Sequence, residues 1–598
     1  MSPTSPTATN VSLVSFSIKV EGKPIDSTYQ VVSIDTWVAV NRVPKAQLVI
    51  YDGSAAEGTF PISSAEVFLP GKKVEISAGY NGKDTLIFRG VVVKQGIEID
   101  QVSASRLVVD ITDEAIKMTL ERKNAIFEKV KDSALIEKLI SNSGLKKKVT
   151  ATTTVYEEII QYYATDWDMM LTRAELNGFV VIVENGTVMV QKPDTQQAAA
   201  LSVKYGDTIL DLQAELDAST QYSQSAIKSY TWDSATQKLI EAGPSAVNVK
   251  EQGNVSSDQL AQVFKVKKFM QQTGGALEKG ALADWSSAEL LKSRLSKIRG
   301  NVRFQGSAKA VTGKTLDLGG LGTRFNGTAF ISGVHHSITD GQWLTTVEFG
   351  LSSQWFAEET QLAVPNAAGQ LPPIKGLQTG VVKKVAQDPS GEYRVQISLP
   401  LLQDASKVVW ARLGGFYASN KVGAVFFPEV NDEVIVGFMN EDPRFPIILG
   451  SVYSKKLAPP VPPDDKNGKK VIVTRSKLQI TFDDENKILQ INTPGKHTIK
   501  LDDTSGAISI QDSNRNTLSL SKGGITLDSA SNLNIKAKGN ITVQAGGNLG
   551  LKATANATLE GLQVANKAKA KFSANGAATA EVTSSGMLTI RGTLVKIN

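Results

Sequence analysis

Five carboxylates close together are the clearest candidates for catalytic chemistry: Glu429, Asp432, Glu433, Glu441 and Asp442. Two carboxyl groups on either side of a glycosidic bond can hydrolyse it, one as the acid and the other as the base or nucleophile. These residues fall in predicted loops, however, and no aromatic cleft that could hold a sugar is evident. We therefore expect them to form turns and salt bridges.

Two adjacent histidines, His335 and His336, are the candidate metal ligands. Neighbouring residues of a strand point to opposite faces, and no third ligand is evident, so we expect a structural role for both. Cysteine is absent, which excludes thiolate zinc sites. The glycines have neither phosphate-loop nor dinucleotide-binding spacing, and no Ser-His-Asp set stands out. The sequence thus predicts no metal, no cofactor and no enzymatic activity.

One basic segment could bind phosphate: Lys292, Arg294, Lys297 and Arg299 lie on a helix that we predict from Ser286 to Gly300. Because the segment has no interleaved aromatic residues and an apolar stripe lies opposite, we expect these side chains to form a solvated face. The whole chain carries a net charge of only +6 over 598 residues. Nucleic acid is therefore not an expected partner.

The first predicted domain is rich in strands. Residues 1–10 are expected to be a flexible N-terminus without a signal-peptide pattern, so the protein would be made in the cytoplasm and leave by another route than general secretion. Residues 11–364 show short runs of alternating apolar and polar residues, which predict β-barrels with a few inserted helices. Two of these helices should run from about Asp132 to Gly144 and from Thr165 to Gly178.

Two Asn-Gly pairs predict tight hairpins in this domain, because both central positions of such a turn adopt positive φ. Asn81-Gly82 would join strands at 74–80 and 85–94. Asn185-Gly186 would join strands at 179–183 and 187–191. Further strands are expected at 11–20, 46–51 and 105–111.

Two Pro-rich segments, 365–375 and 456–469, are predicted linkers on either side of a compact β domain, 376–455. Short strand-forming runs in this domain predict an OB-like barrel of about five strands. Such a barrel can bind single-stranded nucleic acid through exposed aromatic residues. We predict instead a core position for three phenylalanines that are flanked by acids, Phe426, Phe427 and Phe438, the first two on a strand at 424–427.

The C-terminal region, 470–598, begins with irregularly spaced strand patterns and then repeats itself. Between Gly524 and Leu559 apolar residues recur every eight positions, separated by Asn and Gly. This pattern predicts a short strand and a turn in every octad. The inward-facing residues are expected to be Ile525, Leu527, Leu533, Ile535, Ile541, Val543, Leu549 and Leu551.

The length of the repeat determines the predicted assembly. Eight extended residues span only about 26 Å, too little for one chain to enclose a core and stack on itself. Single-chain solenoids generally use about 20 or more residues per coil. Three chains that each form one side of a triangular coil would meet this requirement. We therefore predict a parallel homotrimer that ends in a narrow triangular β-prism, the needle.

Residues 428–453 resemble the OB-domain signature of VgrG spike proteins and of the central needle proteins of contractile phage tails. Asn431 and Glu441 stand where that signature has glycine, and Asn tolerates positive φ. Residues 68–90, 166–183 and 333–350 resemble the hub half of VgrG proteins. The matching signature positions include Pro428, Glu429, Asp432, Glu433, Asp442, Pro443, Pro446 and Gly450.

The resemblance implies a homotrimeric spike of a contractile injection system, either a type VI secretion system or an extracellular phage-tail-like particle. Its hub would bind the hexameric inner tube and baseplate proteins, and its needle would puncture the target membrane and deliver effector cargo. After firing, the spike would be extracellular or in the target cell. A PAAR-type tip protein would cover the apolar end of the needle, where unpaired strand edges invite pairing: Leu588, Ile590, Leu594, Val595 and Ile597.

Two alternatives stay open from the sequence. A trimeric tailspike-type glycan or peptidoglycan hydrolase would share the needle, although no lysozyme-like insertion follows the OB-like domain. The needle also contains six lysines between Ser529 and Ala580. Their charge would either attract anionic envelopes or keep the strand edges from aggregating.

Overall fold

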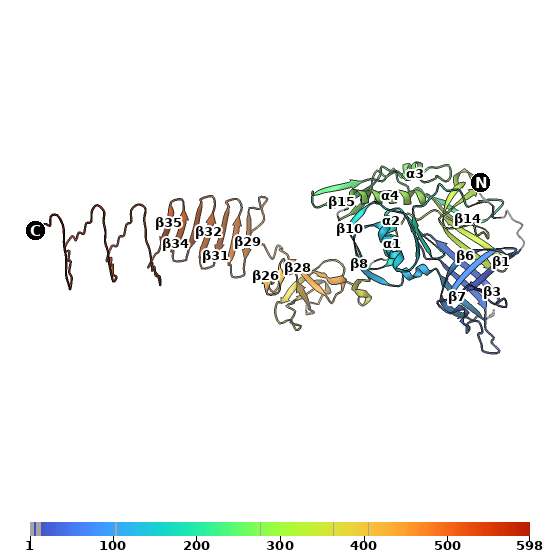
Figure 1. Cartoon of the computed structure of the whole chain (residues 1–598), viewed down its shortest axis with the longest axis horizontal. Helices are drawn as coiled ribbons and strands as arrows, with labels where there is room; N and C mark the ends of the chain where they lie inside the picture. The colour runs from blue at the N-terminus through green and yellow to red at the C-terminus, as the bar shows by residue number, and fades with distance from the viewer. Residues whose placement is uncertain are drawn as a thin grey trace. The chain divides into compact units, whose positions relative to one another are not determined.

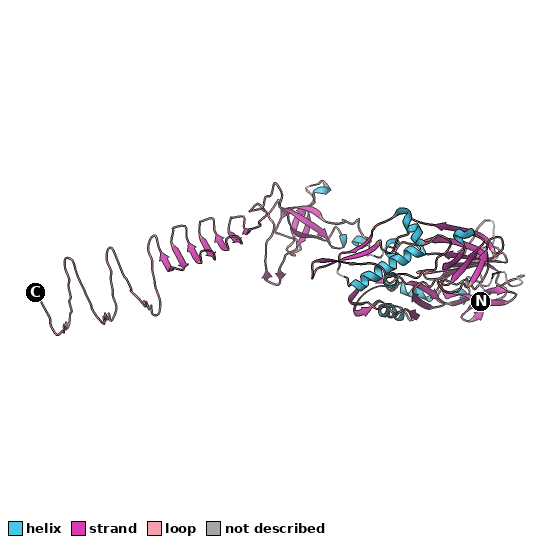
Figure 2. Cartoon of the chain, turned by 90° about the horizontal axis from the view of Figure 1, so that it is seen from above, coloured by secondary structure: helices cyan, strands magenta, loops and turns pink. Residues whose placement is uncertain are grey.

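The computed structural model describes residues 5–6, 13–101, 105–275, 277–360, 362, 364–404 and 406–597. The chain forms two compact units, Met1–Gly450 and Ser451–Asn598. Strands dominate both, and the described helices belong to the first unit (Figures 1 and 2). The predicted mainly-β class is therefore confirmed. Of the expected flexible N-terminus, residues 1–4 and 7–10 lie outside the described residues.

A 13-stranded sheet forms the centre of the first unit. Its main path is β14-β18-β21-β20-β3-β4-β7-β6-β5-β1-β2, and β19 also pairs with β20 and with β13. The strands are β1 Val14–Val20, β2 Lys23–Pro24, β3 Val31–Ala39, β4 Lys45–Tyr51, β5 Lys73–Tyr80, β6 Lys83–Glu98, β7 Arg106–Thr112, β13 Leu201–Lys204, β14 Ile209–Leu216, β18 Ile298–Gln305, β19 Thr315–Gly319, β20 Gly327–Thr339 and β21 Gln342–Phe349.

The two halves of this sheet enclose separate apolar cores. The first is built around residues such as Ile34 and Leu48, and the second around residues such as Phe304 and Val347. β20 joins the halves, because it pairs with β3 on one side and with β21 on the other. The predicted hairpin is present between β5 and β6, where Asn81 and Gly82 have φ values of 55° and 73°.

Helices and three small sheets accompany the large sheet. The first two predicted helices are present, and the Thr165 hydroxyl accepts a hydrogen bond from the Asp168 N–H at 3.0 Å. Within the described ranges, no helix combines the length and apolar character needed to cross a bilayer. The helices are α1 Asp132–Asn142, α2 Asp166–Leu176, α3 Ser257–Phe264, α4 Lys279–Leu295, α5 Gly322–Phe325 and α6 Phe356–Glu359. The strands are β8 Arg122–Lys131, β9 Lys146–Val149, β10 Val155–Thr165, β11 Val180–Glu184, β12 Thr187–Gln191, β15 Ile227–Asp233, β16 Lys238–Ala242 and β17 Phe269–Thr273.

The third predicted helix is wrong at both ends. α4 begins at Lys279 instead of Ser286, and residues 298–300 are the first residues of β18. Ser286 is fully buried in the middle of α4, where its hydroxyl lies 2.7 Å from the Ser229 hydroxyl on β15. Its partner comes from a distant strand, so the local pattern that suggested a helix cap was misleading.

The basic residues of this region are not the solvated face that the pattern predicted. Lys297 is 3% exposed and its ammonium group pairs with Glu251. The Lys292 ammonium lies 2.9 Å from the Glu175 carboxylate on α2. A buried cation needs such compensation, and here it comes from acids far away in the sequence.

Five strands close a barrel in the order β22-β23-β24-β28-β27, as expected for the OB-like domain. The predicted strand at 424–427 is absent, and a short hairpin of β25 and β26 precedes this segment. Phe438 packs against the barrel core, but Phe426 and Phe427 are 62% and 41% exposed, so the core prediction is wrong for these two. The strands are β22 Gln378–Lys384, β23 Val395–Ser398, β24 Val409–Leu413, β25 Ala418–Ser419, β26 Val422–Gly423, β27 Glu433–Phe438 and β28 Pro446–Ser451.

Seven five-residue strands form one sheet in the second unit, and each pairs antiparallel with the next (Figure 1). We call this sheet the meander. Residues 529–597, which we call the octad segment, contain no strand. The meander strands are β29 Lys469–Val473, β30 Gln479–Asp483, β31 Ile488–Asn492, β32 Thr498–Asp502, β33 Ala507–Gln511, β34 Thr517–Ser521 and β35 Gly524–Asp528.

Candidate functional site: an uncovered apolar sheet face

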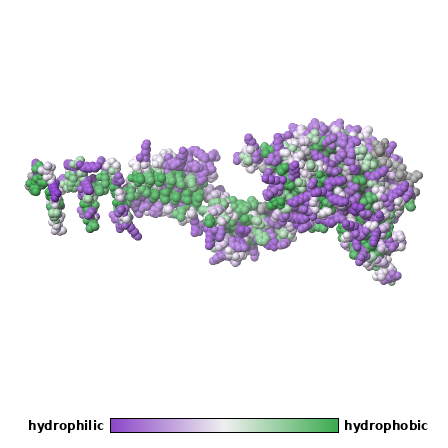
Figure 3. Space-filling model, viewed as in Figure 1, coloured by the Kyte–Doolittle hydropathy of each residue, from purple (hydrophilic) through white to green (hydrophobic). Residues whose placement is uncertain are grey.

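One side of the meander is apolar along its whole length. Side chains alternate between the two faces of a strand, and the register of the meander places apolar residues directly opposite one another across six strand pairs. Figure 3 shows them gathered as a continuous green band. We call this surface the apolar face. Its two rows are Ile472, Ile480, Ile491, Ile499, Ile510, Leu518 and Leu527, and Phe482, Leu489, Leu501, Ile508, Leu520 and Ile525.

Its central side chains remain open to solvent in the single chain. Ile499 and Leu501 are each 39% exposed, and Ile508 and Ile510 are 42% and 43% exposed. Isolated apolar residues on a surface need no explanation, but a contiguous apolar surface of this kind marks an interaction site. The apolar face is therefore the strongest candidate for an assembly surface in the second unit.

The opposite face of the meander is mostly polar, with Val471, Val473 and Ile488 as exceptions, and it makes its own hydrogen bonds. The Gln490 amide donates to the Asn492 side chain at 2.8 Å, and the Lys500 ammonium lies 2.8 Å from the Asp502 carboxylate. Hydrogen bonding to Lys500 lowers the pKa of Asp502 to about 2. These groups favour water, so the polar face is the outer one in any assembly that covers the apolar face.

The predicted needle core falls into two groups in the structure. Ile525 and Leu527 lie on β35 and continue the two apolar rows, opposite Leu520 and Leu518. The other six lie outside strands in the octad segment and are 53–90% exposed: Leu533, Ile535, Ile541, Val543, Leu549 and Leu551. A single chain thus brings only the first two together with other core residues.

The predicted tip residues are also exposed. Leu588, Ile590, Leu594, Val595 and Ile597 have exposed fractions between 47% and 89%. None of these five belongs to a strand. The end of the chain therefore presents apolar side chains that the chain itself does not cover.

Two carboxylates of the OB signature, those of Asp432 and Asp442, are engaged in turns. The Glu429 N–H donates to the Asp432 carboxylate at 2.8 Å. Asp442 is 4% exposed, accepts from the Arg444 N–H at 2.9 Å and pairs with the Arg444 guanidinium at 2.6 Å, which lowers the pKa of Asp442. Carboxylates held by backbone N–H groups and an arginine are not available as a free acid and base.

Other signature residues lie where these turns and strands meet. Asn431 has a φ of 75°, so it takes the left-handed conformation that glycine usually supplies, and Glu441 does so as well with a φ of 56°. Pro428 precedes the first turn and Pro443 lies in the second. Glu433 opens β27, Pro446 opens β28, and Gly450 lies within β28.

The two histidines have structural environments on opposite faces of β20. The His335 ring stacks on Trp37 with ring centroids 5.0 Å apart and bonds to Asp35 at 2.9 Å. His336 is buried, and burial lowers its pKa to about 3. In the part of the chain that the structure describes, no three His, Cys, Asp or Glu side chains are grouped to hold a metal ion.

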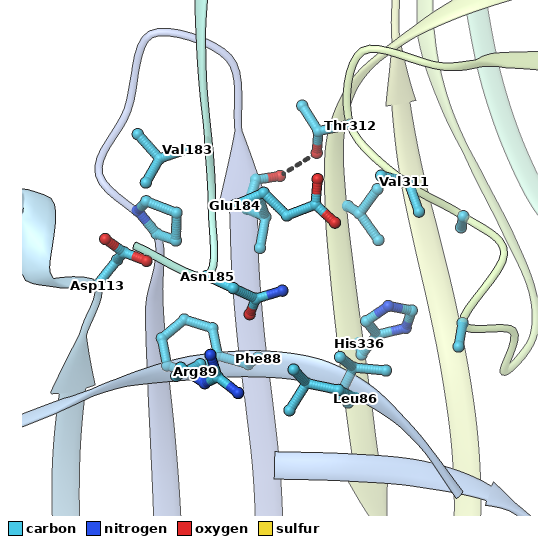
Figure 4. A pocket seen from close by; sticks show the side chains of 16 residues that line it. Leu86, Phe88, Arg89, Asp113, Val183, Glu184, Asn185, Val311, Thr312 and His336 are labelled. Carbon is cyan, nitrogen blue, oxygen red and sulfur yellow. Dashed lines mark hydrogen bonds between the residues drawn. The ribbon is translucent and has the colours of Figure 1, made fainter. Parts of the chain in front are cut away.

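Acidic and imidazole side chains do meet at one small cavity of the first unit, which Asp113, Glu184 and His336 line (Figure 4). Its volume is about 70 Å³, whereas ligand pockets are usually roughly 300–1,000 Å³. Asp113 accepts hydrogen bonds from the Ala115 and Gly186 N–H groups at 2.9 and 2.8 Å. Asp113 therefore holds neighbouring backbone segments together, and the cavity is too small for a sugar.

Comparison with solved structures finds phage tail proteins and a secretion-system component. A 43 kDa prophage tail protein from Shewanella oneidensis is 11% identical, with a TM-score of 0.42, over 57% of this chain and 98% of that one. A tail protein from Neisseria meningitidis is 12% identical, with a TM-score of 0.42, over 57% and 98%. An E. coli component of the type VI secretion system is 14% identical, with a TM-score of 0.34, over 73% and 99%.

Two family models match the sequence itself. The model of the Alg8 N-terminal domain matches residues 10–340. The model of the type VI secretion system and phage-baseplate injector OB domain matches residues 378–453, the closed barrel described above. The resemblance to VgrG-like proteins that residues 428–453 predicted is thereby confirmed.

Proposed function

Because this chain belongs to the Alg8 N-terminal domain family through residues 10–340 and carries an injector OB domain at 378–453, we propose that it is the hub and spike of a contractile injection system. Residues 11–364 form the hub, which binds the inner tube and baseplate. Residues 470–598 form the needle, and residues 376–455 form the OB domain. Segment 365–375 links the hub to the OB domain, and segment 456–469 links the OB domain to the needle.

The spike is a homotrimer, and the observation that carries this proposal is the apolar face. Three meanders that turn this face toward a common axis remove both apolar rows from water and leave the polar faces outside. Burial of apolar area contributes about 25 cal/mol per Å². Identical chains can pack against one another through these faces, because each meander has the same two apolar rows and the same spacing between strands. Each strand can therefore lie beside the equivalent strand of the neighbouring chain.

The octad segment continues the same alternation in the trimer. Leu533 to Leu551 lie in phase with Ile525 and Leu527, so strands from the three chains surround one narrow core. The tip residues 588–597 receive a PAAR-type tip protein, and effector cargo travels with the spike through the target membrane. The role is mechanical, which agrees with the engagement of Asp432 and Asp442 in turns.

Sedimentation of the purified chain tests the trimer. We expect a particle of three times 64.0 kDa. Folded single subunits with an ordered distal third would contradict the proposal. Deletion of residues 594–598 should abolish co-purification of the tip protein, and an unchanged yield would contradict the tip assignment.

Two further measurements test the wider role. Negative-stain imaging of the assembled particle with this chain tagged should place the tag at the end of the tube, in a type VI system or an extracellular particle. Incubation of the purified chain with peptidoglycan or capsule should release no sugar, whereas release would support the hydrolase alternative.

A further inference from the structure

Loops leave the meander alternately at its two edges, because consecutive strands run in opposite directions (Figure 1). At one edge, segments 474–478 and 493–497 contain no carboxylate but one arginine and two lysines: Arg475, Lys477 and Lys496. We call this edge the basic edge. At the opposite edge, segments 483–487 and 502–506 contain one lysine and five carboxylates: Asp483, Asp484, Glu485, Asp502 and Asp503. We call this edge the acidic edge.

The turns place these charges at equivalent positions along each edge. The N–H groups of Lys477 and Lys496 each donate to the carbonyl oxygen three residues before, at 2.9 and 3.0 Å. The carboxylates of Asp483 and Asp502 each accept a hydrogen bond from the N–H three residues later, at 2.9 and 3.0 Å. Both sets of charges therefore repeat every two strands, which is roughly 10 Å along the sheet.

Two of these charged side chains are available to another molecule. Lys496 and Asp503 are exposed, and neither forms an ion pair within the described part of the chain, whereas Asp484 and Glu485 pair with lysines of their own chain. Lys496 and Asp503 follow opposite ends of β32, a strand of five residues. Such a strand is roughly 17 Å long. The two side chains can therefore meet only between chains.

The symmetry of a ring determines which edges meet. If three chains run in the same direction and turn the apolar face toward a common axis, each basic edge lies beside the acidic edge of the next chain. A neighbour that runs in the opposite direction with the same face inward would bring like edges together, and like charges in contact oppose association. Exposed ion pairs contribute little to stability, but they discriminate between alternative arrangements. The charges of the meander therefore favour the parallel arrangement.

The loops also fit one another in height along the needle. Segment 493–497 joins β31 to β32, whereas segments 483–487 and 502–506 follow the strands immediately before and after this pair's junction, β30 and β32, and lead into β31 and β33. The loops of the two edges are thus offset by one strand, roughly 4.8 Å. In a ring of chains at equal height, the basic segment lies between the two acidic segments of its neighbour.

We propose that the basic edge of each chain binds the acidic edge of the next chain and thereby sets the direction and the register of the three chains, with Lys496 and Asp503 as the central pair. The proposal rests on the trimeric needle proposed above and names the contact that orders its chains. The partner is a second copy of this chain, because one repeat of this sequence supplies both members of the complementary pair.

Thiol cross-linking of the full-length chain tests the contact, since the sequence contains no cysteine and only introduced thiols react. The key variant carries Lys496→Cys and Asp503→Cys. A thiol-reactive cross-linker that spans two strand spacings, roughly 10 Å, can join the edges of neighbouring chains but not the two ends of β32. Denaturing gel electrophoresis should show a covalent trimer as the main product. The matched control, Lys496→Cys with Lys522→Cys, should give separate chains, because these loops differ in height by three strands, roughly 14 Å.

Three results of this experiment would overturn the proposal. A covalent dimer from Lys496→Cys alone would place two basic edges side by side. A covalent trimer from the control pair would show a different register. Separate chains from the key variant would show that the two edges do not meet. If those separate chains sediment as a trimer, only the edge contact is wrong, whereas single subunits of the unmodified chain would contradict the proposed function itself.

Charge exchange tests the ion pair. Lys496→Glu or Asp503→Lys alone places like charges at every contact between edges, so refolding into trimers at low salt should become roughly tenfold slower. The double variant restores opposite charges at each contact and should refold at nearly the original rate. Lys522→Glu is the matched control and should leave the rate unchanged, because it lies beyond loop 512–516, where both charge signs occur. A double variant as slow as the single variants would contradict the pairing.

Discussion

The meander and the octad segment share one alternation of apolar and polar residues, yet only the meander forms strands within a single chain. In the meander, loops 474–478, 493–497 and 512–516 alternate with shorter loops 484–487 and 503–506. The pattern therefore repeats every 19 residues, whereas two octads comprise 16. Two octads are therefore three residues shorter than one meander repeat. They cannot supply two five-residue strands and two loops of the lengths found in the meander.

This difference separates two kinds of stability. The meander makes its backbone hydrogen bonds internally and needs partners only to cover its apolar face. In the proposed trimer the octad segment would gain both its strands and its core from partner chains, so its structure would depend on assembly. The last meander turn, Lys522-Gly523, is already shorter than the others and marks the transition between the two regions.

The largest expected effect comes from a charge on the apolar face. Ile510→Asp would place three carboxylates in the core of the proposed trimer, at a cost of roughly 3–5 kcal/mol per chain. We expect sedimentation to show single subunits. Ser509→Asp is the matched control, because the neighbouring residue lies on the polar face and should leave the trimer intact. A trimeric Ile510→Asp variant would show that the apolar face is not the interface.

The same variant separates the two regions by hydrogen exchange. In Ile510→Asp subunits, amides of residues 529–597 should lose protection on the order of 100-fold, because their strands require partners. Amides of residues 479–521 should retain part of theirs through pairing within the meander. An equal loss of amide protection in both regions would show that the meander and the octad segment do not differ in their dependence on partner chains. The control variant Ser509→Asp should keep its amide protection in both regions.

A smaller effect is expected from the meander loops, which place basic residues at positive φ. Lys496 has a φ of 61°, and Lys477 and Arg515 occupy the equivalent loop positions with φ values of 67° and 69°. Lys496→Gly should raise the free energy of unfolding by about 0.5–1 kcal/mol, because glycine removes the left-handed strain. Chemical denaturation measures this, with Lys496→Ala as a control that should bring no gain. A gain with alanine would contradict left-handed strain as the cause.

The smallest effect concerns acid. The folded-state pKa of Asp502 is about 2, below its ordinary value of 3.8. The stabilisation by Lys500 is therefore fully present above the ordinary value and is lost as the pH falls toward 2. The melting temperature of Asp502→Asn should change less between pH 5 and pH 2.5 than that of the unmodified chain. An equal change in both chains would assign the acid sensitivity to other groups.

Much of the local structure could be predicted from the sequence because its causes are local. Asn81-Gly82 and Thr165 act through their own backbone conformation and neighbouring N–H groups, and both predictions are confirmed. The 19-residue repeat of the meander was missed because its loops alternate in length. The equal spacing of Lys477, Lys496 and Arg515 is the signal that could have revealed it.

The sequence by itself determined the mainly-β class, the OB barrel with its signature turns, and the alternation that makes one side of the meander apolar. Only the tertiary structure decided that Lys297 is buried, that Phe426 is exposed, and that the apolar residues of the meander align in two rows. The physical reason is distance along the chain. Turns and caps depend on neighbouring residues, whereas burial, ion pairing and strand register depend on partners that folding brings together from remote positions.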